Sequence, residues 1–189
     1  KLFEICRMRG IPIFTFMNKM DRPALNPLEL LDELERVLGI GAFPVTWPLG
    51  DGPDFKGVYD RLQKTLHLYA NQGKGASRAA DHVTGADDPR ISAQLHPSIH
   101  QEWLEQIELL SLAGEAFDDE KVRVGELTPV FFGRAINNFG VQLLLNYFVR
   151  HGMPPMPRKS SQGLIEPTRP DFSGFVFKIQ ANMDPNHRD

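Results

Sequence analysis

Short apolar runs alternate along the chain with longer segments of helical periodicity. Residues 11–17 form an almost continuously apolar run, which is typical of a strand buried on both faces of a parallel sheet. Residues 128–132 show the same pattern and are predicted to form a second buried strand. Amphipathic helices are predicted at 27–38, 97–113, 118–124 and 141–150. This alternation of strands and helices predicts a layered α/β fold.

Residues that commonly cap helices support these boundaries. Asn26 is a preferred residue before the first helical turn, and Gly39 is a typical residue after the last one. In the helix predicted at 97–113, Ser98 and Gln101 have the spacing of a capping box. The ends of both helices are therefore marked in the sequence.

Between these helices the pattern changes. Residues 43–49 and 55–59 alternate around a turn-rich segment and predict a pair of strands, to which 66–69 can add a third. Residues 71–90 are polar, rich in glycine and without periodicity. We interpret 71–90 as a mobile surface loop that is dispensable for folding.

Prolines concentrate in residues 152–170 and predict a semi-rigid, helix-hostile connector. After it, apolar residues alternate with polar or small ones over 172–180, which predicts a half-buried strand. The expected organisation is an α/β domain at 1–151, a linker at 152–170 and the start of an all-β domain at 171–189.

Composition and charge exclude several classes of protein. The net charge of -3 argues against a globally basic nucleic-acid-binding surface. The single cysteine, Cys6, excludes an internal disulfide framework and a multi-cysteine zinc site, which fits a reducing compartment. No apolar run reaches the length of a membrane span, and no signal peptide is recognisable, so a cytoplasmic location is expected. The opening residues resemble the end of a helix already under way, which suggests a fragment.

The strongest chemical signal is the motif Asn18-Lys19-Met20-Asp21 at the carboxyl end of the first predicted strand. Ligands of open α/β sheets collect at that edge. Asp21 can accept both adjacent donors of guanine, N1–H and the amino group, in a planar charge-assisted pair. Asn18 would tie the loop together and reach the purine N7, and the stem of Lys19 would lie over the base. A polar turn after a strand is the simpler alternative.

A second loop, Gly133-Arg134-Ala135, follows the strand predicted at 128–132 and should lie beside the first loop at the same edge. Small residues there would let backbone N–H groups approach the guanine O6 closely. A strand that ends in a glycine-containing turn is common. The position and order of the two loops together favour a guanine pocket.

These two loops resemble the fourth and fifth guanine-binding motifs of the translational GTPases. Within that superfamily the chain is similar to the bacterial release factor three family at residues 14–22, 44–48, 55–59, 128–133 and 172–189. Elongation factor G diverges over the last of these segments, and residues 71–96 are not matched. The resemblance implies the C-terminal part of a P-loop GTPase-type parallel-sheet domain, followed by the first strand of a translation-factor β barrel.

The same resemblance implies a ribosome-dependent GTPase that binds GTP, GDP and Mg²⁺. It also implies contacts with ribosomal RNA and protein, and the departure of class I release factors after peptide release. One position departs from the pattern: many relatives have a hydroxyl residue where this chain has Arg134. If the Arg134 side chain points away, only the Ala135 N–H needs to contact guanine.

Phosphoryl transfer needs a phosphate-cradling loop, a magnesium carboxylate and a water-positioning group, and none is recognisable here. We therefore assign no catalytic or metal residue to this chain, place those functions upstream of Lys1, and expect the fragment alone to be inactive. His96 and His100 are separated by Pro97 and suit capping or surface roles. The alternatives are an elongation factor G-like GTPase and a non-hydrolysing guanine-nucleotide or ribosome-binding module.

Overall fold

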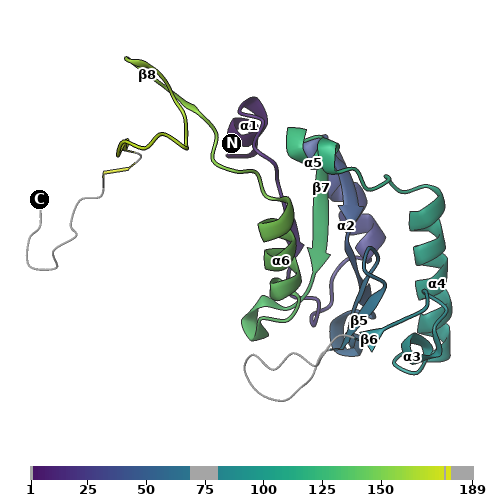
Figure 1. Ribbon diagram of the computed structural model, residues 1–189. Coiled ribbons are helices and arrows are strands. Elements are labelled where there is room, and N and C mark those ends of the chain that lie inside the picture. The colour runs from purple at the N-terminus through teal and green to yellow at the C-terminus, as the bar shows by residue number, and fades with distance from the viewer. Residues whose placement is uncertain (1, 69–80, 177, 180–189) are drawn as a thin grey trace, which may run out of the picture. The chain divides into compact units, whose positions relative to one another are not determined.

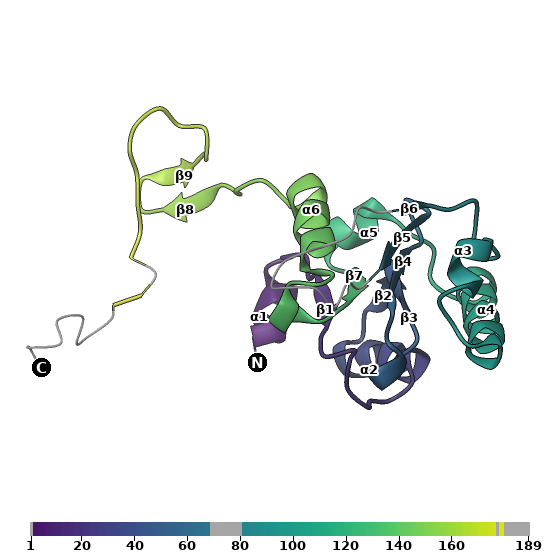
Figure 2. The same cartoon turned by 90° about the horizontal axis from the view of Figure 1, so that it is seen from below.

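The structure is a computed structural model that describes residues 2–68, 81–176 and 178–179. Its contacts divide the chain into two units between Gly152 and Met153, and each unit is described by itself. The first unit contains a three-stranded parallel sheet and a four-stranded antiparallel sheet. Helices cover both sheets (Figures 1 and 2).

The parallel sheet has the strand order β1 (Thr15–Met17), β7 (Leu127–Phe132) and β2 (Gly41–Pro44). All six residues of the central strand β7 are buried, as its apolar sequence predicted. The expectation for residues 11–17 was wrong in two respects: the strand is confined to Thr15–Met17, and its residues are only half-buried. The reason is its place at the edge of the described sheet, where β7 is its only strand neighbour.

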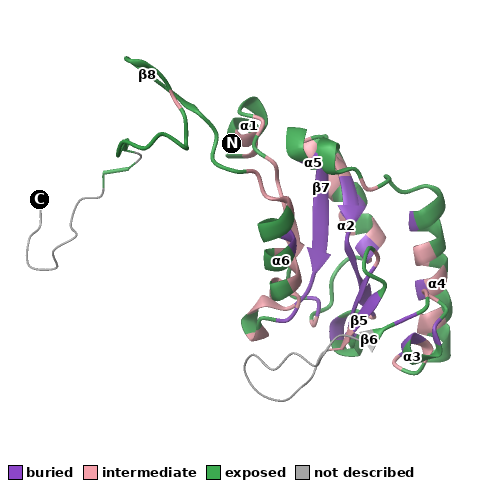
Figure 3. Ribbon diagram, in the orientation of Figure 1, coloured by how far each residue is buried: buried purple, intermediate pink, exposed green. Residues whose placement is uncertain are grey.

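Helices pack on the two faces of this sheet. The helices α5 (Asp119–Val124) and α6 (Val141–His151) contribute Val122 and Tyr147 to an apolar cluster with Phe131. On the other face, α2 (Pro27–Leu38) contributes Leu31 to a cluster with Val130 and Phe132. Figure 2 shows α6 and α2 on different sides of the strands, and Figure 3 shows the buried residues concentrated on the strands. The layered α/β fold is confirmed.

A short helix, α1 (Leu2–Met8), precedes β1, and the boundaries of α2 agree with the sequence prediction. The Asn26 side chain accepts a hydrogen bond from the Leu28 N–H at 3.0 Å. Gly39 ends the helix in the left-handed conformation, at φ 67°, where it has no Cβ to clash.

The antiparallel sheet has the order β3 (Thr46–Leu49), β4 (Gly57–Asp60), β5 (Thr65–Leu68) and β6 (Asp81–His82). The predicted strand pair is confirmed as β3 and β4, and the third strand as β5. However, the apolar run 43–49 is divided between two sheets, since β2 ends at Pro44 and β3 begins at Thr46. Alternation alone could not show that break, because both halves are buried.

One face of this second sheet is covered by α3 (Pro89–Ser92) and α4 (Pro97–Leu112), as Figures 1 and 2 show. The Trp103 indole N–H of α4 donates to the Pro48 carbonyl at 2.8 Å. The predicted capping box of α4 was wrong: the helix begins after His96, so Ser98 already lies inside the first turn. The Ser98 hydroxyl instead forms a hydrogen bond with the His96 ring, at 2.9 Å.

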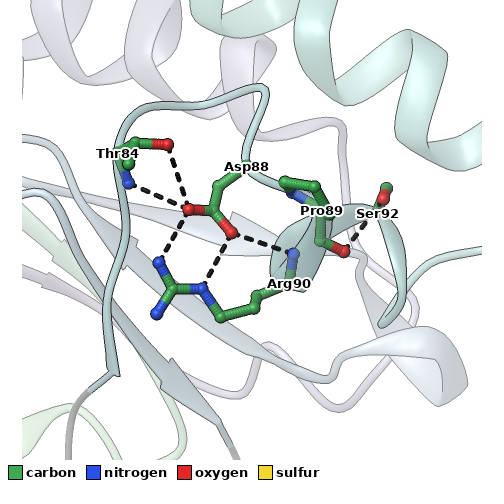
Figure 4. Close-up of polar contacts among 5 residues, drawn as sticks. All are labelled: Thr84, Asp88, Pro89, Arg90 and Ser92. Carbon is green, nitrogen blue, oxygen red and sulfur yellow. Dashed lines mark hydrogen bonds and ion pairs between the residues drawn. The ribbon is translucent and has the colours of Figure 1, made fainter.

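The loop predicted at 71–90 was partly wrong. Residues 71–80 lie outside the described residues, but the part after them contains β6 and the start of α3. Asp88 is only 4% exposed and accepts hydrogen bonds from the backbone and side chain of both Thr84 and Arg90, as Figure 4 shows. Polar composition indicated a solvent-exposed loop, whereas these residues satisfy one another inside a folded turn.

The second unit contains a hairpin of β8 (Arg158–Ser160) and β9 (Gly163–Ile165) within the predicted connector. The proline pattern did not indicate these strands. Residues 171–176 and 178–179 are described and carry no strand, whereas Phe177 and Gln180 lie outside the described residues. The first strand of a β barrel therefore stays a prediction.

The described part of the first unit also contains two short 3-10 turns: η1 (Gly52–Asp54) lies between β3 and β4, and η2 (Ala135–Asn137) follows β7.

Candidate functional site

The two loops singled out from the sequence begin at the same edge of the parallel sheet. Met17 and Phe132, the last residues of β1 and β7, are paired in register. The Gly133 N–H donates to the Met17 carbonyl at 3.0 Å, and the Met20 N–H donates to the Gly133 carbonyl at 3.2 Å. The expected proximity of the loops is confirmed, and backbone hydrogen bonds maintain it.

Met20 anchors the first loop to the apolar core. Its side chain is 2% exposed and belongs to the main apolar core, and its carbonyl accepts a hydrogen bond from the Gly52 N–H at 2.8 Å. Lys19 has a φ of 68°, a left-handed conformation that costs a non-glycine residue on the order of 1–3 kcal/mol. The buried Met20 offsets that cost, and Asn18 and Lys19 are left exposed at the surface.

Asn18 joins the two loops. Its Oδ1 accepts hydrogen bonds from the Lys19 N–H at 2.8 Å and from the Ala135 N–H at 2.9 Å. Both neighbours are donors, so the side-chain oxygen faces them, and its amide nitrogen supplies two donors of the kind that pair with a purine N7. The predicted tying role of Asn18 is therefore confirmed, whereas its contact with a base stays a proposal.

Asp21 and Arg134 form an ion pair across the two loops. The Arg134 Nε lies 3.1 Å from the Asp21 Oδ2, and each side chain is 27% exposed. The Arg134 side chain therefore does not point away from the first loop, and pointing away is the condition under which its departure from the family pattern would matter little. A carboxylate at the mouth of the facing loop attracts the guanidinium, and no local sequence pattern shows that contact.

Glycine at position 133 has a different explanation from the one the sequence suggested. A Cβ at this position would lie 2.3 Å from the Phe139 carbonyl oxygen. That carbonyl accepts the Arg134 N–H at 3.0 Å, and the Phe139 N–H donates back to the Arg134 carbonyl at 3.1 Å. Gly133 is thus required for a tight backbone bridge to Phe139, and its own N–H is engaged by Met17.

The edge that holds these loops offers donors and acceptors for a planar heterocycle. An aspartate carboxylate accepts two adjacent N–H groups, and an asparagine amide donates to a ring nitrogen. A cavity of about 520 Å³ lies at the other end of the strands, and its charged lining residues are Arg7, Glu35, Glu115 and Glu126. With three carboxylates and one guanidinium, this lining has a net negative charge that would repel a nucleotide phosphate, so the carboxyl edge is the better candidate.

A second cavity, of about 390 Å³, contains titratable residues that sequence reasoning missed. It is lined in part by Asp60, His67 and Tyr147. Burial raises the pKa of Asp60 and Tyr147 and lowers the pKa of His67. No sequence signal could have found this group, because β4, β5 and α6 are far apart along the chain.

Within the described residues, no group of three or more His, Cys, Asp or Glu side chains is placed to hold a metal ion. None of the described helices is long and apolar enough to span a membrane.

Residues 1–154 match the family described as the elongation factor Tu GTP binding domain. Over the whole chain, the sequence is 54% identical to a peptide chain release factor 3 from Gloeobacter violaceus and 52% identical to one from Synechocystis sp.. The matches cover 100% of this chain but only 36% and 35% of those proteins, so the chain spans about a third of their length.

A crystal structure of a protein from Thermus thermophilus has a similar fold. The TM-score is 0.53 at 24% sequence identity, over 80% of this chain and 24% of that one. This likeness supports the α/β architecture.

Proposed function

The chain belongs to the family of elongation factor Tu GTP-binding domains, and from this premise we propose that its two loops recognise the base of a guanine nucleotide. The observation that carries the proposal is the convergence of Asn18, Asp21 and Ala135 at the carboxyl edge of the parallel sheet. Sheets of this type bind their ligands at that edge.

The proposed roles follow from the chemistry of each group. Asp21 accepts the guanine N1–H and amino group, one on each carboxylate oxygen. The Asn18 amide donates to N7, the Lys19 stem covers the base plane, and the loop of Gly133, Arg134 and Ala135 faces O6. Adenine has no proton on N1, and a site built on such a hydrogen bond discriminates by roughly 10⁴ to 10⁵.

The exchange Asp21→Asn tests this proposal in the full-length protein that carries the chain. An amide cannot accept both guanine donors, so we expect GDP to bind at least tenfold more weakly, about 1.4 kcal/mol or more. Xanthosine diphosphate has an oxygen in place of the amino group and should bind better to the variant than to the unchanged protein. Calorimetry measures both affinities.

The matched control is Asp32→Asn, which changes an exposed aspartate on α2. It should leave both affinities as they are. Unaltered GDP binding by the Asp21→Asn protein would refute the assigned role of Asp21.

For the whole protein we propose a ribosome-dependent GTPase that promotes the departure of class I release factors, acting in the cytoplasm. Support comes from relatives named peptide chain release factor 3 that match all 189 residues, including those beyond the family match at 154. An elongation-factor-like GTPase or a non-hydrolysing binding module lacks that support. Phosphate binding, magnesium binding and hydrolysis are assigned to residues outside this chain, and the chain alone is not expected to hydrolyse GTP.

A further inference from the structure

The Arg134 side chain extends toward the proposed base site from a backbone that is hydrogen-bonded to Phe139. Its backbone is held by the two hydrogen bonds of the bridge to Phe139, which is 7% exposed. Its side chain crosses from the end of β7 to the other loop, where Nε lies 3.1 Å from the Asp21 Oδ2. The guanidinium therefore occupies the carboxylate that the proposed function assigns to guanine.

We propose that Arg134 competes with guanine for the Asp21 carboxylate. Its guanidinium pairs with Asp21 until a guanine base displaces it, and it thereby weakens the binding of guanine nucleotides. The inference rests on the proposed function of Asp21. Arg134 places a positive charge beside a carboxylate that, for base recognition, needs only to accept hydrogen bonds.

Competition, rather than sharing, follows from the charges. Guanine presents two N–H groups, one to each oxygen of Asp21, and both carry partial positive charge at that edge. A guanidinium left against Oδ2 would face this donor edge with its own positive charge. The cation therefore has to leave Oδ2 for the base to form its planar pair.

The Ala135 N–H is a second group of the proposed site that already has a partner within the protein. The Ala135 N–H, the backbone donor proposed to face the guanine O6, already donates to the Asn18 Oδ1 at 2.9 Å. Base binding must therefore redirect or share this hydrogen bond as well. In its described conformation, therefore, both the Asp21 carboxylate and the Ala135 N–H are engaged by groups of the protein itself.

The solvent exposure of Arg134 and Asp21 determines how much nucleotide affinity their ion pair can cost. Each partner of the pair is 27% exposed, and ion pairs accessible to solvent contribute modestly. Removing the cation should tighten guanine nucleotide binding by about two- to fivefold. GDP and GTP should gain by the same factor, because they share the base that Arg134 opposes.

The experiment compares Arg134→Ser and Arg134→Gln with the unchanged full-length protein, by calorimetric titration with GDP and GTP. The glutamine variant keeps most of the length of the arginine side chain but not its charge. If both variants change the nucleotide affinity equally, the cause is the lost charge rather than the lost packing. Arg123→Ser is the matched control, because it removes an exposed arginine that pairs with Glu120 on α5. We expect tighter binding for both Arg134 variants and no change for the control.

Two further measurements identify Asp21 as the point of competition. Salt screens a partly exposed ion pair, so the gain should shrink as the salt concentration rises. In the Asp21→Asn background, titrated with xanthosine diphosphate so that binding stays measurable, Arg134→Ser should produce no gain.

Weaker or equal binding by both Arg134 variants would overturn the inference, and so would an equal gain in the Asp21→Asn background. Neither result bears on the proposed function, which fails only if Asp21→Asn by itself leaves GDP binding unchanged.

Discussion

Asn18, Met20 and Asp21 make different contacts in the first loop. Met20 is buried in the core, Asn18 links the loop to Ala135, and Asp21 faces Arg134. The sequence motif identified the polar residues, because their hydrogen-bonding capacity follows directly from their side-chain types. It could not identify Met20 as the anchor, since its depth depends on the packing of segments far away in the chain.

The buried carboxylate of Asp88 makes the stability of the protein depend on pH. Hydrogen bonds from the Arg90 side chain, and then from the Thr84 and Arg90 backbone, hold the pKa of its carboxyl well below the ordinary range. The folded protein thus favours the charged form, and this contribution to stability is present above about pH 4 and is lost as the pH falls below it. We expect Asp88→Asn to lower the melting temperature of the full-length protein at pH 7.

The difference between the Asp88→Asn and unchanged proteins should shrink as the pH is lowered from 5 toward 3, because the Asp88 carboxyl of the unfolded chain then takes up a proton while that of the folded protein stays charged. Circular dichroism during heating measures both. Asp87→Asn, at the exposed neighbouring position, is the control and should have little effect. A difference that stays constant across this pH range would contradict a role for the charge.

At the scale of elements, α2 connects the first loop to strand β2 of the parallel sheet. It begins six residues after Asp21, at Pro27, and buries Leu31 against the core that also holds Met20. Helix propensity and capping are local properties, which is why both ends of α2 were predicted correctly. A shift of α2 would be transmitted to the loop through the short segment between them.

The cap of α2 allows a direct test. Asn26→Ala removes the acceptor of the Leu28 N–H, and loss of such a cap costs about 1 kcal/mol. We expect amide hydrogen exchange in the first turn of α2 to become roughly fivefold faster, measured by mass spectrometry on the full-length protein. Asn26→Ser retains a capping oxygen and should exchange nearly as slowly as the unchanged protein. Equal acceleration by both variants would show that the cap oxygen is not the cause.

At the scale of the whole molecule, the chain spans about a third of the length of the release factors that it matches. Its similarity to the release factors continues through residues 155–189, beyond the GTP-binding domain match. The described part of the parallel sheet leaves β1 with one strand neighbour.

The full-length protein should hydrolyse GTP faster in the presence of ribosomes and accelerate the departure of a class I release factor from ribosomes after peptide release. Labelled release factor and released phosphate measure the two activities. An elongation-factor-like protein would instead stimulate movement of the ribosome along messenger RNA, which serves as the comparison. Nucleotide binding with no hydrolysis under any of these conditions would favour a binding module.

The sequence by itself determined the α/β class, the ends of α2, the buried strand β7 and the meeting of two loops at one sheet edge. These features follow from periodicity, from capping chemistry and from the rule that parallel strands end at a common edge. Tertiary structure alone decided the break between β2 and β3, the buried turn around Asp88 and the direction of the Arg134 side chain. Each of these depends on which partner lies opposite in space, and a pattern of neighbours along the chain contains no record of the partner's position.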